Sequence, residues 1–179
     1  MRADRPTLKT KQPQVFSKAV PPLYTPDQRR RRDESRWTLV QGILAPIQFF
    51  IFIVSAVLVI RYLLTGDGAQ AATISIVVKT LALYTIMITG CVWEKVVFDK
   101  WLFAEAFWWE DMFSMLVLAL HTGYLIALIW SLGSERSRMI LALAAYAAYA
   151  INATQFLLKL RAARLQSAHD TASLTVAAA

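Results

Sequence analysis

The chain has 179 residues, of which 57% are hydrophobic and only 17% are charged, and its mean hydropathy is +0.45. This composition excludes an ordinary soluble domain and is typical of an integral membrane protein. The net charge of +7 does not indicate nucleic-acid binding, because ten of the nineteen Lys and Arg residues precede residue 37 and fit a topology signal that also contacts anionic lipid. A single cysteine, Cys91, excludes an internal disulfide.

The N-terminal segment is polar and basic. Residues 1–22 contain prolines and show no periodicity, which predicts a disordered cytosolic tail. The segment has no apolar core and no small-residue cleavage site, so it does not read as a signal peptide. The pattern Thr25-Pro26-Asp27-Gln28 then predicts a capped helix start, with proline at the first helical position.

Four apolar stretches follow, at about 37–64, 71–98, 108–132 and 137–160. Each exceeds the roughly 20 residues that cross a bilayer core. We therefore expect an all-α bundle of four transmembrane helices as one domain over 23–166, with a flexible tail over 167–179. Fifteen Lys and Arg residues fall on the side of the termini and three on the other side, which predicts that both termini are cytosolic.

Polar and aromatic side chains recur at helical spacing along one face of each span. These stripes are Gln41, Gln48 and Ser55 in the first span; Thr80, Tyr84, Met87, Cys91 and Glu94 in the second; Glu110 or Asp111, Ser114, Leu118 and His121 in the third; and Tyr149, Asn152, Phe156 and Lys159, with Gln155 adjacent, in the fourth. Lys79 lies beside the second stripe, and we expect it to snorkel toward the non-cytosolic surface.

The candidate site is the cytosolic end of the second and third spans. Glu94, Glu110 and Asp111 lie there, and His121 lies about 15 Å deeper, near the midplane. Ionisable groups in a membrane are functional candidates by default. Structural roles remain open: an interhelical hydrogen bond for His121, a helix N-terminus for Glu110 and Asp111, and an interfacial ion pair for Glu94-Lys95.

Aromatic residues crowd the same end. They are Trp93, Phe98, Trp101, Phe103, Phe107, Trp108 and Trp109. Such a cluster forms either an interfacial belt or a stacking surface for a flat apolar ligand. The sequence has no zinc-type spacing, phosphate loop, nucleophile elbow or dinucleotide fingerprint, which argues against nucleotide-driven or thiol chemistry.

Several unusual blocks run in order along residues 23–166. The N-terminal blocks are Tyr24-Thr25-Pro26, Arg29-Arg30-Arg31-Arg32-Asp33, Trp37-Thr38-Leu39-Val40-Gln41-Gly42, Leu44-Ala45-Pro46 and Gln48-Phe49. The later blocks are Trp93-Glu94-Lys95-Val96-Val97-Phe98, Phe107-Trp108-Trp109-Glu110-Asp111, Leu118-Ala119-Leu120-His121-Thr122 and Gln155-Phe156-Leu157-Leu158-Lys159-Leu160. Together they resemble the 3-vinyl (also called 2-vinyl) bacteriochlorophyllide hydratase family.

The resemblance implies a multi-pass lyase of bacteriochlorophyll synthesis in a bacterial inner membrane, either cytoplasmic or photosynthetic. Such an enzyme adds water across the vinyl group of a chlorophyllide-type magnesium tetrapyrrole, gives a 1-hydroxyethyl group and uses no cofactor. Its expected partners are the tetrapyrrole, water and the lipid bilayer, with other pigment-synthesis enzymes left open and nucleic acid excluded.

Roles for the site residues follow from the chemistry of hydration, which needs a proton donor and a positioned water. Glu110 and Asp111 are expected to supply the acid, with Asp111 favoured, and Glu94 or His121 the base. Gln48 and Asn152 are candidates to orient the water.

Binding roles are expected at the same end. Arg36, Lys95 or Lys100 would pair with the substrate propionate, and Trp108 and Trp109 would contact the macrocycle. His121 is alternatively an axial ligand of the substrate magnesium. Two competing functions stay open: a non-catalytic four-span pigment carrier or assembly factor, and a small transporter subunit with an acidic proton relay.

Overall fold

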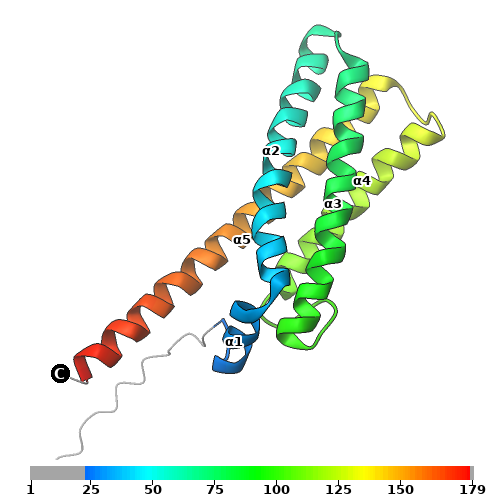
Figure 1. Ribbon diagram of the computed structural model, residues 1–179. Coiled ribbons are helices and arrows are strands. Elements are labelled where there is room, and N and C mark those ends of the chain that lie inside the picture. Colours follow the sequence, from blue (N-terminus) through cyan, green and yellow to red (C-terminus); the bar gives the residue numbers. More distant parts are fainter. Residues whose placement is uncertain (1–22, 178–179) are drawn as a thin grey trace, which may run out of the picture.

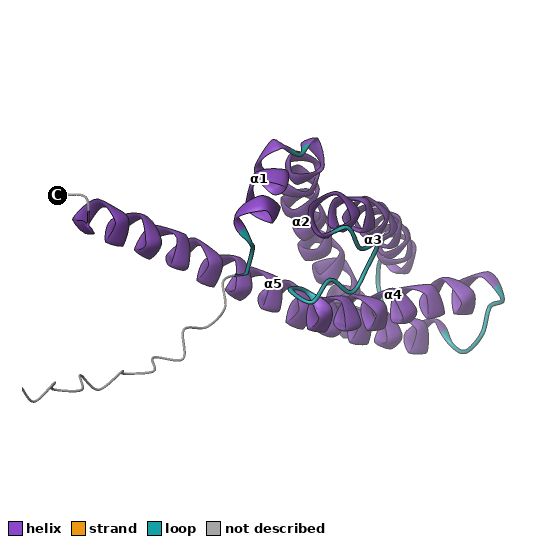
Figure 2. Ribbon diagram, turned by 90° about the horizontal axis from the view of Figure 1, so that it is seen from below, coloured by secondary structure: helices purple, strands orange, loops and turns teal. Residues whose placement is uncertain are grey.

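The computed structural model describes residues 23–177, and within that range it has five helices and no strand (Figures 1 and 2). The helices are α1 (Pro26–Glu34), α2 (Arg36–Thr65), α3 (Ala69–Phe98), α4 (Trp108–Ile129) and α5 (Glu135–Ala177). Four of them, α2 to α5, are long and apolar enough to cross a membrane. The expected all-α fold with four spans is therefore confirmed, and the protein is a multi-pass membrane protein.

The short helix α1 begins where the sequence predicts. Thr25 accepts a hydrogen bond from the Gln28 backbone, and the Gln28 side chain accepts one from the Thr25 backbone, which completes a capping box. Ser35 ends α1 and caps α2. Tyr24 packs between the Arg32 guanidinium and the Phe98 ring, and its burial raises the pKa of its hydroxyl.

The long helices form two antiparallel hairpins. α2 packs mainly against α3, and α4 mainly against α5, with smaller contacts from α2 to α5 and from α3 to α4. Gly66 and Gly68, with φ of 80° and 83°, make the tight turn between α2 and α3. The α3–α4 connection lies at the same end as α1, opposite the other two turns (Figure 1). The candidate carboxylates therefore lie at the α1 end.

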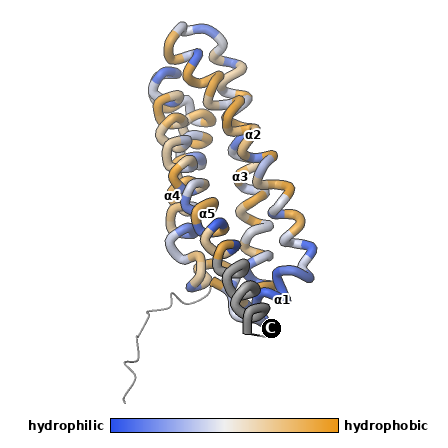
Figure 3. The backbone as a smooth tube through the Cα atoms, turned by 90° about the vertical axis from the view of Figure 1, so that its left-hand side faces the viewer, coloured by the Kyte–Doolittle hydropathy of each residue, from blue (hydrophilic) through white to orange (hydrophobic). Residues whose placement is uncertain are grey.

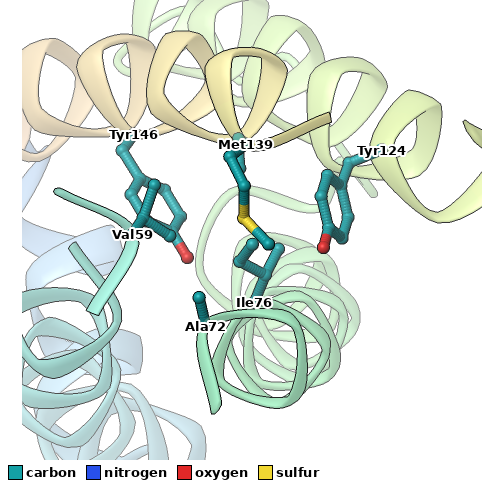
Figure 4. Packing of buried hydrophobic residues seen from close by; sticks show 7 residues of the cluster. Val59, Ala72, Ile76, Tyr124, Met139 and Tyr146 are labelled. Atoms are coloured by element: carbon teal, nitrogen blue, oxygen red, sulfur yellow. The ribbon is translucent and has the colours of Figure 1, made fainter. Parts of the chain in front are cut away.

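Apolar packing holds the two hairpins together. Val59, Ala72, Ile76, Tyr124, Met139 and Tyr146 form a buried cluster that draws on α2, α3, α4 and α5 (Figure 4). Elsewhere the helices expose many large apolar side chains, and hydrophobic segments dominate the tube between the polar ends (Figure 3). Such an outer surface suits lipid contact.

One expectation needs correction. Lys79 does not snorkel to a surface, because its side chain points into the bundle and is 0% exposed. The helix α5 continues beyond the fourth predicted span to Ala177. The expected disordered tail over 1–22 lies outside the described residues.

Candidate active site

A pair of buried carboxyl groups joins the ends of α3 and α4. Glu94 lies in the last two turns of α3, Asp111 in the first turn of α4, and their exposed fractions are 5% and 4%. The two carboxyl groups lie within hydrogen-bonding reach of each other. Because two carboxylates at that separation repel strongly in a low-dielectric site, the pair is expected to hold one shared proton.

The α3–α4 connection supplies a backbone donor to each carboxyl group. The Phe103 N–H donates to Asp111 Oδ2 over 2.9 Å, and the Ala104 N–H donates to Glu94 Oε2 over 3.2 Å. Phe103 has a φ of 59°, a conformation that is unfavourable for a bulky residue. The connection is thus held in a strained turn that aims two successive amides at the pair.

Glu110 faces a different partner. Lys159 Nζ on α5 donates to Glu110 Oε2 over 2.6 Å, and the same ammonium lies 5.0 Å from the centroid of the Phe107 ring. We expected Glu110 and Asp111 together to supply the acid; the structure gives Asp111 the carboxyl group of Glu94 as its direct partner and gives Glu110 a cation. Successive residues point about 100° apart on a helix, since a turn takes 3.6 residues, so both could not face α3.

One turn above Asp111, Ser114 and Asn152 link α4 to α5. Asn152 Nδ2 donates to Ser114 Oγ over 2.8 Å, and Asn152 Oδ1 has no partner in the described part of the chain. Gln48 is buried on α2, but no hydrogen bond connects it to Asn152 or to either carboxyl group. Of the two predicted orienting residues, Asn152 alone lies in a polar contact next to the pair.

His121 lies deeper in the bundle, as expected. Its exposed fraction is 1%. Because the Val117 carbonyl can only accept, Nδ1 donates to it over 2.8 Å, and Nε2 has no partner among the described residues. About 15 Å of helix, or ten residues, separates His121 from Asp111. The structure therefore does not bring His121 to the carboxyl pair.

The aromatic residues divide into an inner and an outer group. Trp93, Phe98 and Phe107 pack edge to face, and Phe107 stacks on Phe156 of α5 at 5.8 Å. Trp101, Trp108 and Trp109 are exposed. The inner group packs together at the α1 end of the bundle, while Trp108 and Trp109 are exposed and accessible to lipid or ligand.

The predicted anion-binding cations lie near this end with different partners. Lys95 Nζ lies 2.6 Å from Asp99 Oδ1, and this ammonium holds the pKa of the Asp99 carboxyl below its usual range. Lys100 makes a looser pair with Glu105 at 3.6 Å. Arg36 is exposed and has no ion-pair partner within residues 23–165.

Sequence reasoning missed three contributors to this geometry. The amides of Phe103 and Ala104 lie in the α3–α4 connection, whose sequence has no helical or strand periodicity, so no sequence pattern predicts where these amides point. The role of Lys159 could have been found, because Lys159 lies on the same stripe as Asn152 and Phe156.

The fold and the site together define a class: a four-span membrane protein with a buried pair of carboxyl groups at one end of the bundle. The family model for 2-vinyl bacteriochlorophyllide hydratase matches residues 24–162. The chain belongs to this family, which confirms the resemblance seen in the sequence.

Two relatives carry the same name. The 2-vinyl bacteriochlorophyllide hydratase of Rhodobacter capsulatus is 61% identical over 154 residues, covering 86% of this chain and 90% of the relative. That of Cereibacter sphaeroides is 62% identical over 143 residues, covering 80% and 89%. No solved structure matches the chain.

Proposed function

We propose that this chain hydrates the 3-vinyl group of a chlorophyllide-type magnesium tetrapyrrole to a 1-hydroxyethyl group, in bacteriochlorophyll synthesis for photosynthesis. Membership of the hydratase family supports the reaction. The observation that carries the mechanism is the buried Glu94–Asp111 pair, which offers a proton donor and a proton acceptor side by side. The site of action proposed is the bacterial inner membrane, cytoplasmic or photosynthetic.

The shared proton suits addition of water to an alkene. In this proposal Asp111, as the acid, transfers its proton to the terminal vinyl carbon, and the π electrons form the new C–H bond. The cation left on the inner carbon is conjugated with the macrocycle. A water oxygen then bonds to that carbon, and Glu94 takes the proton that the water loses. The pair again holds one proton, and each transfer typically contributes about 10²–10⁴ in rate.

Asn152 and His121 lie at different depths in the bundle, and we therefore give them different roles in the proposal. Asn152 lies one turn from Asp111, and its free Oδ1 can accept a hydrogen bond from the attacking water. His121 is about 15 Å away along α4, too far to act on the same vinyl group. Magnesium lies at the centre of the macrocycle and the vinyl group at its rim, so His121 also lies too deep to ligate the metal of a substrate whose vinyl group is at the pair.

The propionate is proposed to pair with Arg36, Lys95 or Lys100. Arg36 has no competing anion, whereas Lys95 must leave Asp99, so Arg36 is favoured. Arg36→Glu should raise KM for the free acid far more than for its propionate ester, because only the acid carries the charge. Steady-state kinetics with both substrates measures this, and equal effects on the two would remove Arg36 from propionate binding. Lys95→Glu and Lys100→Glu are the matched comparisons.

The competing function is pigment carriage without chemistry, favoured by the apolar outer surface and the exposed tryptophans. Membranes that contain the protein, incubated with a 3-vinyl chlorophyllide in H₂¹⁸O, distinguish the two. A hydratase gives a hydroxyethyl product that carries ¹⁸O and is absent from control membranes. Pigment recovered with its vinyl group intact would instead favour the carrier.

A further inference from the structure

An open groove lies on the seam between α3 and α4, apart from the carboxyl pair. The groove has a volume of about 320 Å³ and is lined by Tyr84, Met87, Ile88, Leu118 and Thr122. This volume falls within the roughly 300–1,000 Å³ of small-molecule sites. The Ile88 side chain is 67% exposed, so the groove opens to the outer surface of the bundle, and a ligand that arrives from the bilayer can reach its lining.

A pair of hydroxyl groups is the polar feature of this lining. Tyr84 Oη and Thr122 Oγ1 lie 2.8 Å apart, and Thr122 Oγ1 also donates to the Leu118 carbonyl over 2.8 Å. A hydroxyl group has one proton, and Thr122 gives its proton to Leu118. Tyr84 is therefore the donor in its contact with Thr122. The Tyr84 proton can turn to a ligand in the groove, because Thr122 keeps its own bond to Leu118.

The hydroxyl pair and the carboxyl pair lie on the same seam. Each pair joins a side chain of α3 to a side chain of α4. Tyr84 precedes Glu94 by ten residues, and Thr122 follows Asp111 by eleven, so about 15 Å of helix separates the two pairs. The seam is thus polar at the carboxyl pair, apolar along the groove and polar again at the hydroxyl pair.

This order fits a flat apolar ring system with polar groups at opposite rims. The other lining residues of the groove have apolar side chains: Met87, Ile88 and Leu118. In a chlorophyllide-type macrocycle the ring ketone lies across the ring system from the vinyl group. A substrate with its vinyl group at the carboxyl pair therefore brings its ketone toward the hydroxyl pair. A lipid acyl chain has no acceptor for the Tyr84 proton, so the groove suits the substrate better than lipid.

We propose that the substrate macrocycle lies in this groove and that the Tyr84 hydroxyl donates a hydrogen bond to its ring ketone oxygen. This inference rests on the proposed function, from which it takes the substrate. Binding replaces one acceptor of the Tyr84 proton, Thr122 Oγ1, by another. The contact forms at the rim that does not react, and it thereby fixes which rim faces Glu94 and Asp111.

The first test removes only the hydroxyl group. Resonance Raman spectra of a 3-vinyl chlorophyllide bound to the full-length protein in nanodiscs report the ketone stretching band. We expect the wild-type band to lie below its position in a solvent without hydrogen-bond donors. Tyr84→Phe should return the band to that position and raise Kd about threefold to tenfold. An identical band in wild type and Tyr84→Phe would overturn the proposal. Tyr62→Phe, which removes a hydroxyl group that contacts Glu135, is the matched control and should match the wild type.

Two further comparisons separate a contact with the pigment from a structural role. Tyr84→Phe should leave Kd unchanged for a pigment whose ring ketone is replaced by a methylene group. An equal loss with both pigments would show that Tyr84 only supports the fold and would overturn the contact. Thr122→Val should keep the lowered band, because the Tyr84 proton remains. A return to the free position in Thr122→Val would contradict donation by Tyr84.

The second test fills the groove. Ile88→Trp places a bulky side chain in it, whereas Val78→Trp places the same side chain in a second groove, of about 190 Å³, between α2 and α3. Both positions are exposed on α3. Ile88→Trp should raise Kd for 3-vinyl chlorophyllide about tenfold or more, and Val78→Trp should match the wild type. An unchanged Kd in Ile88→Trp would show that the pigment binds elsewhere, leave the groove to lipid and overturn the proposal.

Failure of this inference is distinguishable from failure of the proposed function. A lowered ketone band that depends on Tyr84, in membranes that give no ¹⁸O product, would refute the hydratase and leave the contact standing. Hydration with an unshifted band would refute the contact and leave the hydratase standing.

Discussion

At the scale of residues, the three carboxyl groups at this end, Glu94, Glu110 and Asp111, have different partners. Glu110 has the Lys159 ammonium as its partner at 2.6 Å. Asp111, its neighbour in the chain, has a carboxyl group for its partner instead, and the same holds for Glu94. In the proposed mechanism the Glu94–Asp111 pair therefore supplies both the acid and the base, because two adjacent carboxyl groups titrate as one unit.

The Glu110–Lys159 pair should matter for stability rather than chemistry. Lys159→Met leaves the Glu110 carboxylate buried without its cation and should cost about 3 kcal/mol of unfolding free energy. Adding Glu110→Gln should recover most of that loss. Denaturant titration of the solubilised protein measures the cycle.

A surface pair provides the control for that cycle. Lys100→Met removes the exposed pair with Glu105 and should cost about 1 kcal/mol or less. Strict additivity of the Lys159 and Glu110 changes would contradict their coupling.

At the scale of elements, the α3–α4 connection is part of the site rather than a link between spans. It ends α3 at Asp99, turns through Phe103 in a left-handed conformation and starts α4 at Trp108. Two of its successive amides fix the carboxyl groups that the helix ends present. A strained residue kept at such a point is common where geometry serves function.

Substitutions at Phe103 test this role. Phe103→Gly keeps the N–H and adopts a φ of 59° easily, so hydration should stay within a few-fold of the wild type. Phe103→Pro lacks the N–H and cannot adopt that φ, so the rate should fall about tenfold or more while the pigment still binds. Single-turnover kinetics with bound pigment measures both. Equal rates in the two variants would show that the amide of residue 103 does not position Asp111.

The stripes show how far sequence reasoning reaches. Helical spacing placed Ser114, His121 and Asn152 on inward faces, and all three are buried, because a period of 3.6 residues fixes the face of a side chain. The partner of a side chain on a neighbouring helix depends on the angle and register at which the two helices pack. The spacing of residues along one helix does not predict that angle or register. The pairing of Asp111 with Glu94 and the burial of Lys79 therefore had to come from the structure.

At the scale of the molecule, two hairpins with modest mutual contact form the bundle. The carboxyl pair lies where α3 of one hairpin meets α4 of the other. A groove of about 320 Å³ opens along the same seam, lined by Tyr84, Met87, Ile88, Leu118 and Thr122. A site at such a seam can admit a flat substrate from the bilayer, because few contacts must part. The basic α1 and the C-terminal end of α5 lie at the same end of the bundle as the carboxyl pair (Figure 1).

Orientation in the membrane follows from that charge distribution. Fifteen Lys and Arg residues against three predict that both termini are cytosolic. Epitope tags fused at residues 1 and 179 should both resist protease added outside intact cells and be cut after the cells are opened. Cleavage of either tag in intact cells would contradict this topology and would move the carboxyl pair to the other face.

The most direct test of the central proposal compares Asp111→Asn and Glu94→Gln with Glu105→Gln, an exposed carboxylate at the same end. Pigment binding and ¹⁸O incorporation are measured on the same membranes. Asp111→Asn and Glu94→Gln should bind 3-vinyl chlorophyllide but lose hydration by about 10²-fold or more, while Glu105→Gln keeps the wild-type rate. Full hydration in both Asp111→Asn and Glu94→Gln would show that the buried pair does not perform the chemistry.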